Sequence, residues 1–169
     1  MRLLALLLTV FVALTTGCEK KSAFDLTNEG LALVKAGRNG PALRRFEAAI
    51  RADPKYPFGY YYAAGLYNEA GKWDRAEQYL HKTIELRPDY ANAYYTLGFV
   101  LENRAKHLVE THSQGIDPAE LHDLSGSAFA RYAEDHPPPD RADQQTLEDL
   151  LKRSREAYAE AAKRGIPIP

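Results

Sequence analysis

The chain has 169 residues, which suffice for one folded domain or a short repeat array but leave little room for two independent cores. Apolar residues make up 45% of it and charged residues 27%, a composition typical of a folded chain rather than a disordered one. Because 22 Lys and Arg residues are balanced by 23 Asp and Glu residues, the basic excess typical of nucleic-acid binding is absent, and we expect no nucleic-acid partner.

Residues 1–17 have the pattern of a secretory signal peptide. Arg2 gives a positive start, and the apolar run from Leu3 to Leu14 is shorter than the roughly 20 residues that span a bilayer. The sequence Leu14-Thr15-Thr16-Gly17-Cys18 then resembles the lipobox of bacterial lipoproteins, although Thr15 stands where an aliphatic residue is usual. An ordinary signal peptide that is cut nearby is the alternative.

Cys18 is the only cysteine of the chain, so it has no intramolecular disulfide partner, and lipidation would explain a lone exported thiol. The resemblance implies that an acylated Cys18 anchors the chain to a lipid bilayer. It also implies the outer membrane, facing the periplasm, because Glu19 rather than Asp follows the cysteine. The inner membrane stays open as an alternative. Residues 18–22 would form the lipidated tether.

Pro54 and Pro88 lie 34 residues apart and set the phase of an internal repeat. Before each proline, a small, a large and a small residue follow one another at the same spacing. These are Ala42, Phe46 and Ala49 in one unit, and Ala76, Leu80 and Thr83 in the next. The pattern resembles the tetratricopeptide repeat, which implies two antiparallel helices in each unit. We therefore expect one unit over residues 23–56 and another over residues 57–90.

Small residues have a physical role in this interpretation. Gly30, Ala64 and Gly98 would let the two helices of a unit approach closely, and Gly37 and Gly71 would end the first helices in a left-handed conformation.

The third unit departs from the pattern. Its proline is due near residue 122, but the spacing of eight residues from an aromatic residue to a proline next occurs at Phe129 and Pro137. We therefore predict a degenerate unit over residues 91–139, with an insertion around residues 106–116, and a C-terminal capping helix within residues 140–169. In that last helix Ser154, Tyr158 and Ala161 again have the family spacing. The expected fold class is all-α, a right-handed tetratricopeptide-repeat superhelix of antiparallel helix pairs.

No catalytic or metal-binding motif stands out. His107 and His112 are five residues apart, which turns their side chains about 140° from each other, whereas a two-histidine zinc helix needs a spacing of four. We therefore expect no catalytic residues, no metal, no cofactor and no enzymatic activity. The pair Glu134 and Asp135 beside His136 leaves an unrecognised hydrolase open as an alternative.

The resemblance implies a concave groove, lined by the first helices, that binds a peptide. The positions carried over as groove residues are Phe58, Tyr61, Asn68, Glu69, Asn92, Tyr95, Phe99 and Asn103, with Phe24, Thr27, Leu31 and Glu102 beside them. We expect the aromatic rings to stack on apolar side chains of the ligand and the asparagines to hold its backbone. Packing of these rings between neighbouring units is the alternative.

These features favour a membrane-anchored scaffold that presents the groove to a protein or peptide partner of an envelope assembly. A pilotin-like assembly factor for an outer-membrane protein is one alternative, and a cell-wall enzyme is an alternative of a different class. A purely structural spacer would be favoured if the chain's own C-terminal helix filled the groove.

Overall fold

The computed structural model describes residues 20–112 and 117–168. The helices of these ranges are α2 (Ala23–Lys35), α3 (Asn39–Ala52), α4 (Pro57–Glu69), α5 (Trp73–Leu86), α6 (Ala91–His112), α7 (Pro118–Asp123), α8 (Gly126–Asp135) and α9 (Arg141–Lys163). The described ranges contain no strand, in agreement with the expected all-α class. Within the same ranges, no helix combines the length and the apolar character needed to cross a bilayer.

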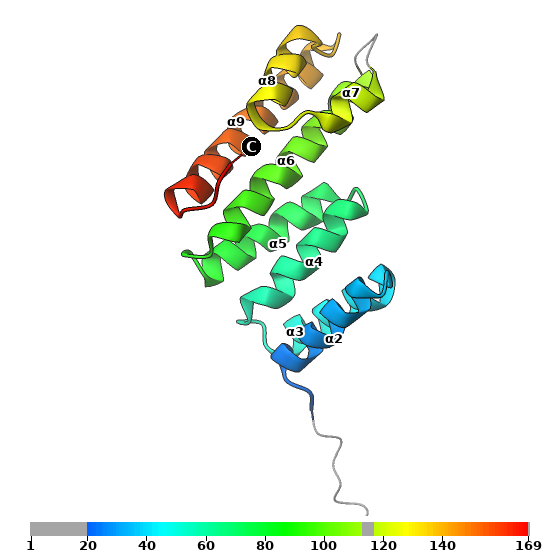
Figure 1. Cartoon of the computed structure of the whole chain (residues 1–169), viewed down its shortest axis with the longest axis vertical. Helices are drawn as coiled ribbons and strands as arrows, with labels where there is room; N and C mark the ends of the chain where they lie inside the picture. Colours follow the sequence, from blue (N-terminus) through cyan, green and yellow to red (C-terminus); the bar gives the residue numbers. More distant parts are fainter. Residues whose placement is uncertain (1–19, 113–116, 169) are drawn as a thin grey trace, which may run out of the picture.

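Antiparallel helix pairs stack side by side into an elongated row (Figure 1). Helix α2 packs on α3, α4 packs on α5, and α6 packs on α9. The pairs are joined in sequence, because α3 contacts α4 and α5 contacts α6. The α2–α3 pair lies at one end of the row, and α7 and α8 lie at the other end (Figure 1).

The first two pairs have the same turn between their helices. Gly37 and Gly71 follow the first helices with φ angles of 69° and 68°, the left-handed conformation that the sequence predicts there. In both turns the amide after the glycine donates to the carbonyl oxygen five residues before it, at 2.9 Å. The repeat read from the sequence is therefore a repeat of backbone geometry.

The prolines of the repeat connect each pair to the next. The Tyr60 hydroxyl donates to the Pro54 carbonyl oxygen at 3.2 Å, and the Tyr94 hydroxyl donates to the Pro88 carbonyl oxygen at 3.1 Å. Both tyrosines lie in the first helix that follows the proline. The same hydrogen bond thus fixes the start of α4 on α3 and the start of α6 on α5.

Glycine residues allow close approach of the helices within a pair. A Cβ at Gly30 would lie 2.4 Å from the Phe46 ring, and a Cβ at Gly98 would lie 2.8 Å from the Tyr158 ring. Real side-chain contacts are not that short, so each glycine makes room for the ring of the opposite helix. The predicted role of these small residues is confirmed. Since Gly98 meets Tyr158, α9 lies beside α6 as α3 lies beside α2.

The second helix of the third pair differs from our prediction. We expected it to include Phe129 and to end at Pro137, which would make it α8, but α6 pairs with α9 (Figure 1). Helix α8 has only 10 residues, whereas the 23 residues of α9 match the 22 of α6 and bury more apolar surface along it. Helices α7 and α8 are therefore an insertion between the two helices of the last pair, and α9 also closes the array as a capping helix.

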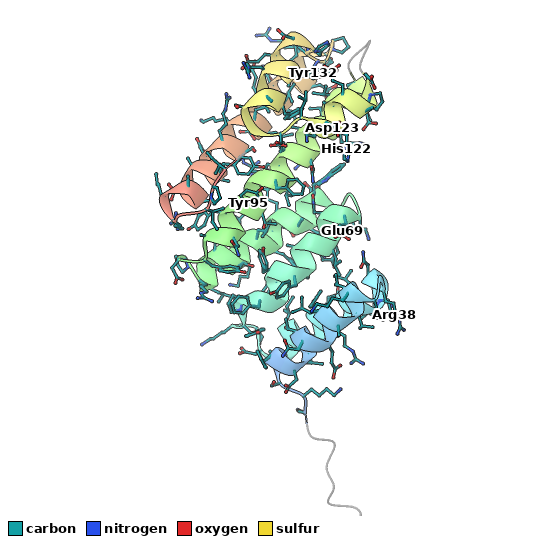
Figure 2. The ribbon with its side chains drawn as sticks, in the orientation of Figure 1. Arg38, Glu69, Tyr95, His122, Asp123 and Tyr132 are labelled. Atoms are coloured by element: carbon teal, nitrogen blue, oxygen red, sulfur yellow. The ribbon has the colours of Figure 1, made fainter. Side chains whose placement is uncertain are left out.

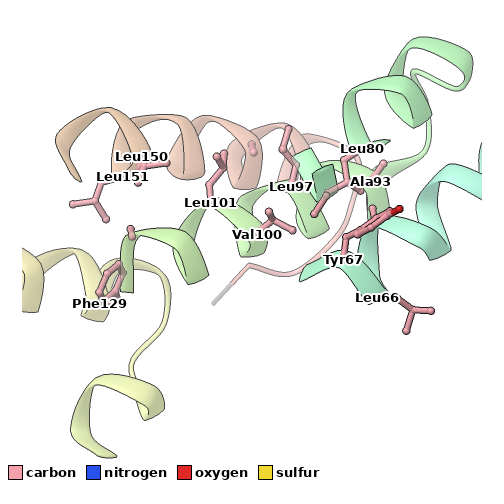
Figure 3. Close-up of a cluster of buried hydrophobic side chains, with 14 of the residues drawn as sticks. Leu66, Tyr67, Leu80, Ala93, Leu97, Val100, Leu101, Phe129, Leu150 and Leu151 are labelled. Carbon is pink, nitrogen blue, oxygen red and sulfur yellow. The ribbon is translucent and has the colours of Figure 1, made fainter. Parts of the chain in front are cut away.

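The core follows the row of helices. Figure 3 shows Leu97, Val100 and Leu101 of α6 among side chains from α5 and α9. The α6 residues Val100 and Leu101 are at most 1% exposed. A second, small cluster of Ala23, Leu26 and Ala49 lies between α2 and α3. Most of the buried core therefore belongs to the second and third pairs, and the α2–α3 pair contributes fewer buried residues to it.

Candidate functional site

The first helices of the three pairs, α2, α4 and α6, share one face of the array, and we call the surface between them the groove. Between α2 and α4 the groove contains a hollow of about 230 Å³. Its walls are mainly apolar and include Leu31, Val34, Tyr61, Tyr62 and Leu66. Glu69 and Thr96 add polar groups to the lining. The hollow is therefore suited to an apolar side chain whose own backbone lies along the groove.

Gly65 leaves this hollow open. A Cβ built on Gly65 would meet no heavy atom within 4 Å, although the residue lies within α4 and lines the hollow. Gly59, six residues earlier on the same helix, is close-packed instead, because a Cβ there would lie 3.0 Å from the Ile50 side chain. Packing within the protein therefore does not require a glycine at residue 65, and the missing side chain leaves space on the surface of the groove.

A second hollow, of about 500 Å³, continues the groove between α4, α6 and α7. Its lining is polar, with Asn68, Glu69, Asn103, Lys106 and Glu110 among its residues. The Asn103 side-chain amide donates to the Asn68 side-chain oxygen at 3.2 Å. One face of the array therefore changes from apolar between α2 and α4 to polar between α4 and α6.

Tyr61 is half-buried and forms part of the wall of the first hollow. Its hydroxyl shares a 3.3 Å hydrogen bond with the Thr96 hydroxyl, which connects α4 to α6. Its ring contacts the rings of Tyr62 and Tyr90 edge-on, with centroids 5.2 and 5.1 Å apart. Burial raises the pKa of the Tyr61 phenol, so the hydroxyl stays neutral. The same residue therefore lines the groove and joins two units.

Glu69 lies at the end of α4, where Figure 2 labels it, and it is exposed. Its carboxylate accepts a 2.8 Å hydrogen bond from the Asn39 side chain, across from α3. Since it borders both hollows, it puts a negative charge at the point where the groove turns from apolar to polar.

Two other predicted groove residues pack against aromatic neighbours. The Phe58 ring contacts Tyr90 edge-on at 5.4 Å, and the Arg87 guanidinium lies 5.4 Å from its centroid. Tyr95, labelled in Figure 2, contacts the ring of Tyr158 on α9 at 5.5 Å. These contacts correspond to the alternative in which the rings pack between helices.

Phe99 and Asn92 are exposed on α6. Phe99 is 40% exposed, and among the described residues only Phe24 and Ile168 are comparably exposed large hydrophobic side chains. An exposed phenylalanine in the middle of a helix that otherwise buries its apolar residues is available for an intermolecular contact.

Two residues that we placed beside the groove are buried. Thr27 is 2% exposed and Glu102 is 1% exposed, so neither side chain faces a ligand. Glu102 lies on the side of α6 that faces the insertion and α9, whereas Asn103 and Lys106, at neighbouring positions, line the second hollow.

Glu102 has a structural role instead. Its carboxylate accepts hydrogen bonds from the Gly126 amide at 2.8 Å and from the Tyr158 hydroxyl at 3.2 Å, and it pairs with Lys106 at 3.2 Å. Burial, with the neighbouring Glu102 charge, raises the pKa of Tyr158. This carboxylate holds the start of α8 and the side of α9 on α6.

The described part of the chain shows no group of three or more His, Cys, Asp and Glu side chains that could hold a metal ion. The His107 ring lies tilted against the Trp73 ring with centroids 4.8 Å apart, and His136 stacks against the Tyr132 ring at 4.2 Å. Glu134 and Asp135 are exposed at the end of α8. The predicted lipidation site, Cys18, lies outside the described residues.

Comparisons with known proteins agree with this geometry. Residues 33–103 match the family model of the tetratricopeptide repeat. A crystal structure of MamA protein is similar, with a TM-score of 0.51 and 17% identity over 89% of this chain and 62% of the MamA chain. This chain therefore spans less than two thirds of that MamA chain.

Two further solved structures are tetratricopeptide-repeat domains. The Sgt2 domain from Aspergillus fumigatus has a TM-score of 0.48 and 18% identity over 87% of this chain and 85% of its own. The first such domain of Spaghetti, solved bound to an HSP90 peptide, has a TM-score of 0.48 and 21% identity over 81% and 95%. The stacked helices of residues 33–103, which match the family model, have the fold of the tetratricopeptide repeat.

Proposed function

We propose that this chain, whose residues 33–103 carry tetratricopeptide repeats, is a membrane-anchored scaffold that binds an extended segment of a protein partner in an envelope assembly. Tetratricopeptide arrays are protein-interaction scaffolds whose curvature creates an extended binding surface. The observation that carries the proposal is the open apolar hollow beside Gly65, which continues into a polar surface along the same face.

The geometry favours a ligand with one apolar side chain followed by polar backbone contacts. The apolar side chain would enter the hollow beside Tyr61 and Leu31 and displace water from it. The Asn68 and Asn103 side chains would then contact the ligand backbone, in exchange for the 3.2 Å hydrogen bond between them. Glu69 favours a basic residue of the ligand at the boundary between the two hollows.

The proposed anchor is an acylated Cys18, in the outer membrane and facing the periplasm. Only four residues separate Cys18 from the first residue of α2, so the array would stay close to the bilayer. Confinement of scaffold and partner to one membrane raises the effective concentration of each for the other, so a modest affinity of the groove suffices.

A substitution that fills the hollow tests the groove. Gly65→Gln puts a long side chain into open space beside Leu31 and Tyr61, and it favours the helix, because glycine inside a helix costs about 0.5–1 kcal/mol. We expect the variant to fold and to lose the partners that co-purify with the native protein from solubilised envelopes, as identified by mass spectrometry.

The matched control is Gly40→Gln. Gly40 is also a helical glycine whose Cβ would meet no heavy atom within 4 Å, but it lies on α3 and does not line the hollow. This variant should keep all partners of the native protein. If Gly65→Gln keeps them as well, the groove is not the binding surface.

A further inference from the structure

The charges of this chain are unevenly distributed along the row of helices. Residues 20–56, which include α2 and α3, contain eight Lys and Arg but only four Asp and Glu, a net charge of +4. Residues 57–169 contain 13 Lys and Arg and 18 Asp and Glu, a net charge of −5. The net charge of the whole chain is therefore close to zero because a basic N-terminal end and an acidic remainder nearly cancel.

The four acidic residues of the basic end already have partners within the protein. Asp25 accepts from the Ser22 hydroxyl at 2.6 Å, and Glu29 pairs with Lys21 and Arg45. Glu47 accepts from the Tyr67 hydroxyl at 2.8 Å, and Asp53 accepts from the Lys55 amide at 2.9 Å. Of these four, Glu29 pairs with cations, whereas the neutral donors leave the negative charge of the other three in place, and the net charge of +4 counts all four.

Six of the eight basic side chains at this end are exposed and form no ion pair within residues 20–112 and 117–168. They are Lys20, Lys35, Arg38, Arg44, Arg51 and Lys55. Arg44 and Arg51 are seven residues apart, so they lie on one face of α3, separated by two turns. The uncompensated positive charge is thus a surface property of the first helix pair.

An exposed aromatic residue lies at the same end. Phe24 is in the first turn of α2 and is 61% exposed, the highest exposure of a large hydrophobic side chain among the described residues. Phe24 is six positions after Cys18 in sequence, and even a fully extended chain of that length spans only roughly 20 Å. A ring this close to a lipid-linked residue is within reach of the membrane interface.

We propose that the α2–α3 pair contacts an anionic phospholipid surface, with Phe24 inserted at the interface and the unpaired basic side chains on the headgroups. This inference rests on the proposed anchor at Cys18. Basic residues close to an anionic bilayer are attracted to it, and the attraction fades within a Debye length. The net charge of −5 in residues 57–169 is repelled by the same surface, so the row of helices from α4 onward would extend away from the membrane.

The experiment places a fluorescent reporter at the proposed contact. The chain has one tryptophan, Trp73, at the start of α5, and the double variant Phe24→Trp, Trp73→Phe moves the reporter to the first turn of α2. The protein is recovered from membranes, its acylation at Cys18 is read by mass spectrometry, and it is placed in vesicles containing brominated lipids. The vesicles are made from phosphatidylcholine alone or from an equal mixture with phosphatidylglycerol.

We expect lipid bromine to quench the residue-24 tryptophan at least about twofold more strongly in the anionic vesicles, and to leave the native Trp73 unquenched in both. Arg44→Glu with Arg51→Glu should abolish the difference. The matched control reverses two exposed cations of α9, Lys152→Glu with Arg155→Glu, and should keep it. Circular dichroism of each variant verifies that the fold is intact.

Three results would overturn the contact: no quenching at residue 24, equal quenching in neutral and anionic vesicles, or an equal loss in the α9 control. If instead mass spectrometry finds no acyl group, the proposed anchor is wrong. The unacylated protein is then mixed with the same vesicles, and quenching of its residue-24 tryptophan tests the membrane contact independently of the anchor. Binding of an acidic protein by this surface would leave all vesicle signals unchanged and would also overturn the proposal.

Discussion

At the scale of single residues, the glycines of this array have two opposite functions. Gly30 and Gly98 are required by packing, because a Cβ at either would lie less than 3 Å from an aromatic ring of the opposite helix. Gly65 is helical too, but its missing side chain leaves space in the groove. Only the structure separates the two kinds, since all three glycines lie in first helices of the repeat.

This difference predicts that substitutions at Gly98 and Gly65 change the free energy of unfolding in opposite directions. Gly98→Ala should lower the free energy of unfolding by about 1–2 kcal/mol, because displacement of the buried Tyr158 ring outweighs the gain in helix propensity. Gly65→Ala should raise it by about 0.5–1 kcal/mol, because the helix gains and nothing is displaced. Urea unfolding followed by circular dichroism measures both. Equal effects of the two substitutions would contradict the assignment of Gly98 to close packing.

At the scale of helices, the sequence was sufficient for the first two pairs and insufficient for the third. Pro54 and Pro88 set the boundaries, and the glycine turns followed from them. In the last pair the spacing of small and large residues occurs at Phe129 and again at Tyr158, and only Phe129 is followed by a proline eight residues later, so the spacing favours Phe129. The choice depends on how much surface each helix buries on α6, and no spacing rule contains this quantity.

Helix α9 is held on the array by charge as well as by packing. Glu77 of α5 pairs with Arg153 of α9, and Arg104 of α6 lies 3.9 Å from the same carboxylate. Hydrogen bonding from His81, with the Arg153 charge, holds the pKa of Glu77 below its ordinary value of 4.5, against the opposing effect of burial. This carboxylate therefore joins second helices of neighbouring pairs.

The lowered pKa of Glu77 predicts a pH-dependent contribution to stability. A carboxyl group whose pKa is lower in the folded state stabilises it above the unfolded pKa, and the contribution is lost as pH falls through the folded value. Glu77→Gln should lower the free energy of unfolding by about 1 kcal/mol at neutral pH, since the site is partly solvated. Its difference from the native protein should shrink as pH falls below 4.5.

Urea unfolding at neutral and acidic pH measures this effect. Glu85→Gln is the control, because Glu85 lies on the same helix, is exposed, and among residues 20–112 and 117–168 pairs only with Lys82, three residues before it. That substitution should change the free energy of unfolding by less than about 0.5 kcal/mol. A Glu77→Gln deficit that is independent of pH would show that lost packing, and not the charge, is responsible.

At the scale of the whole molecule, the residues that the sequence predicts for the groove differ in what their side chains contact. Tyr61 and Glu69 line the hollow, whereas Phe58 and Tyr95 pack on other aromatic rings, and Glu102 is buried under the insertion. Carrying positions over by phase fixes the direction of a side chain along a regular helix. The position of a residue within the repeat does not say which neighbouring side chains it contacts. Those neighbours belong to other helix pairs and to the insertion, which has no counterpart in the repeat.

The linear arrangement also predicts that the two ends of the molecule unfold independently. Helix α2 is held mainly by α3, and this pair contacts the rest mainly through α4, whereas α9 is joined to α6 along its length. In such arrays stability is close to a sum of unit and nearest-neighbour terms. Phe46→Ala removes a fully buried ring between α2 and α3 and should cost about 3–5 kcal/mol there. Native-state hydrogen exchange should then show faster exchange of α2 and α3 amides and little change in α9.

Tyr158→Ala should have the opposite effect, with faster amide exchange in α9 and unchanged protection in α2. Equal loss of protection in all helices would mean that the array unfolds as one cooperative unit.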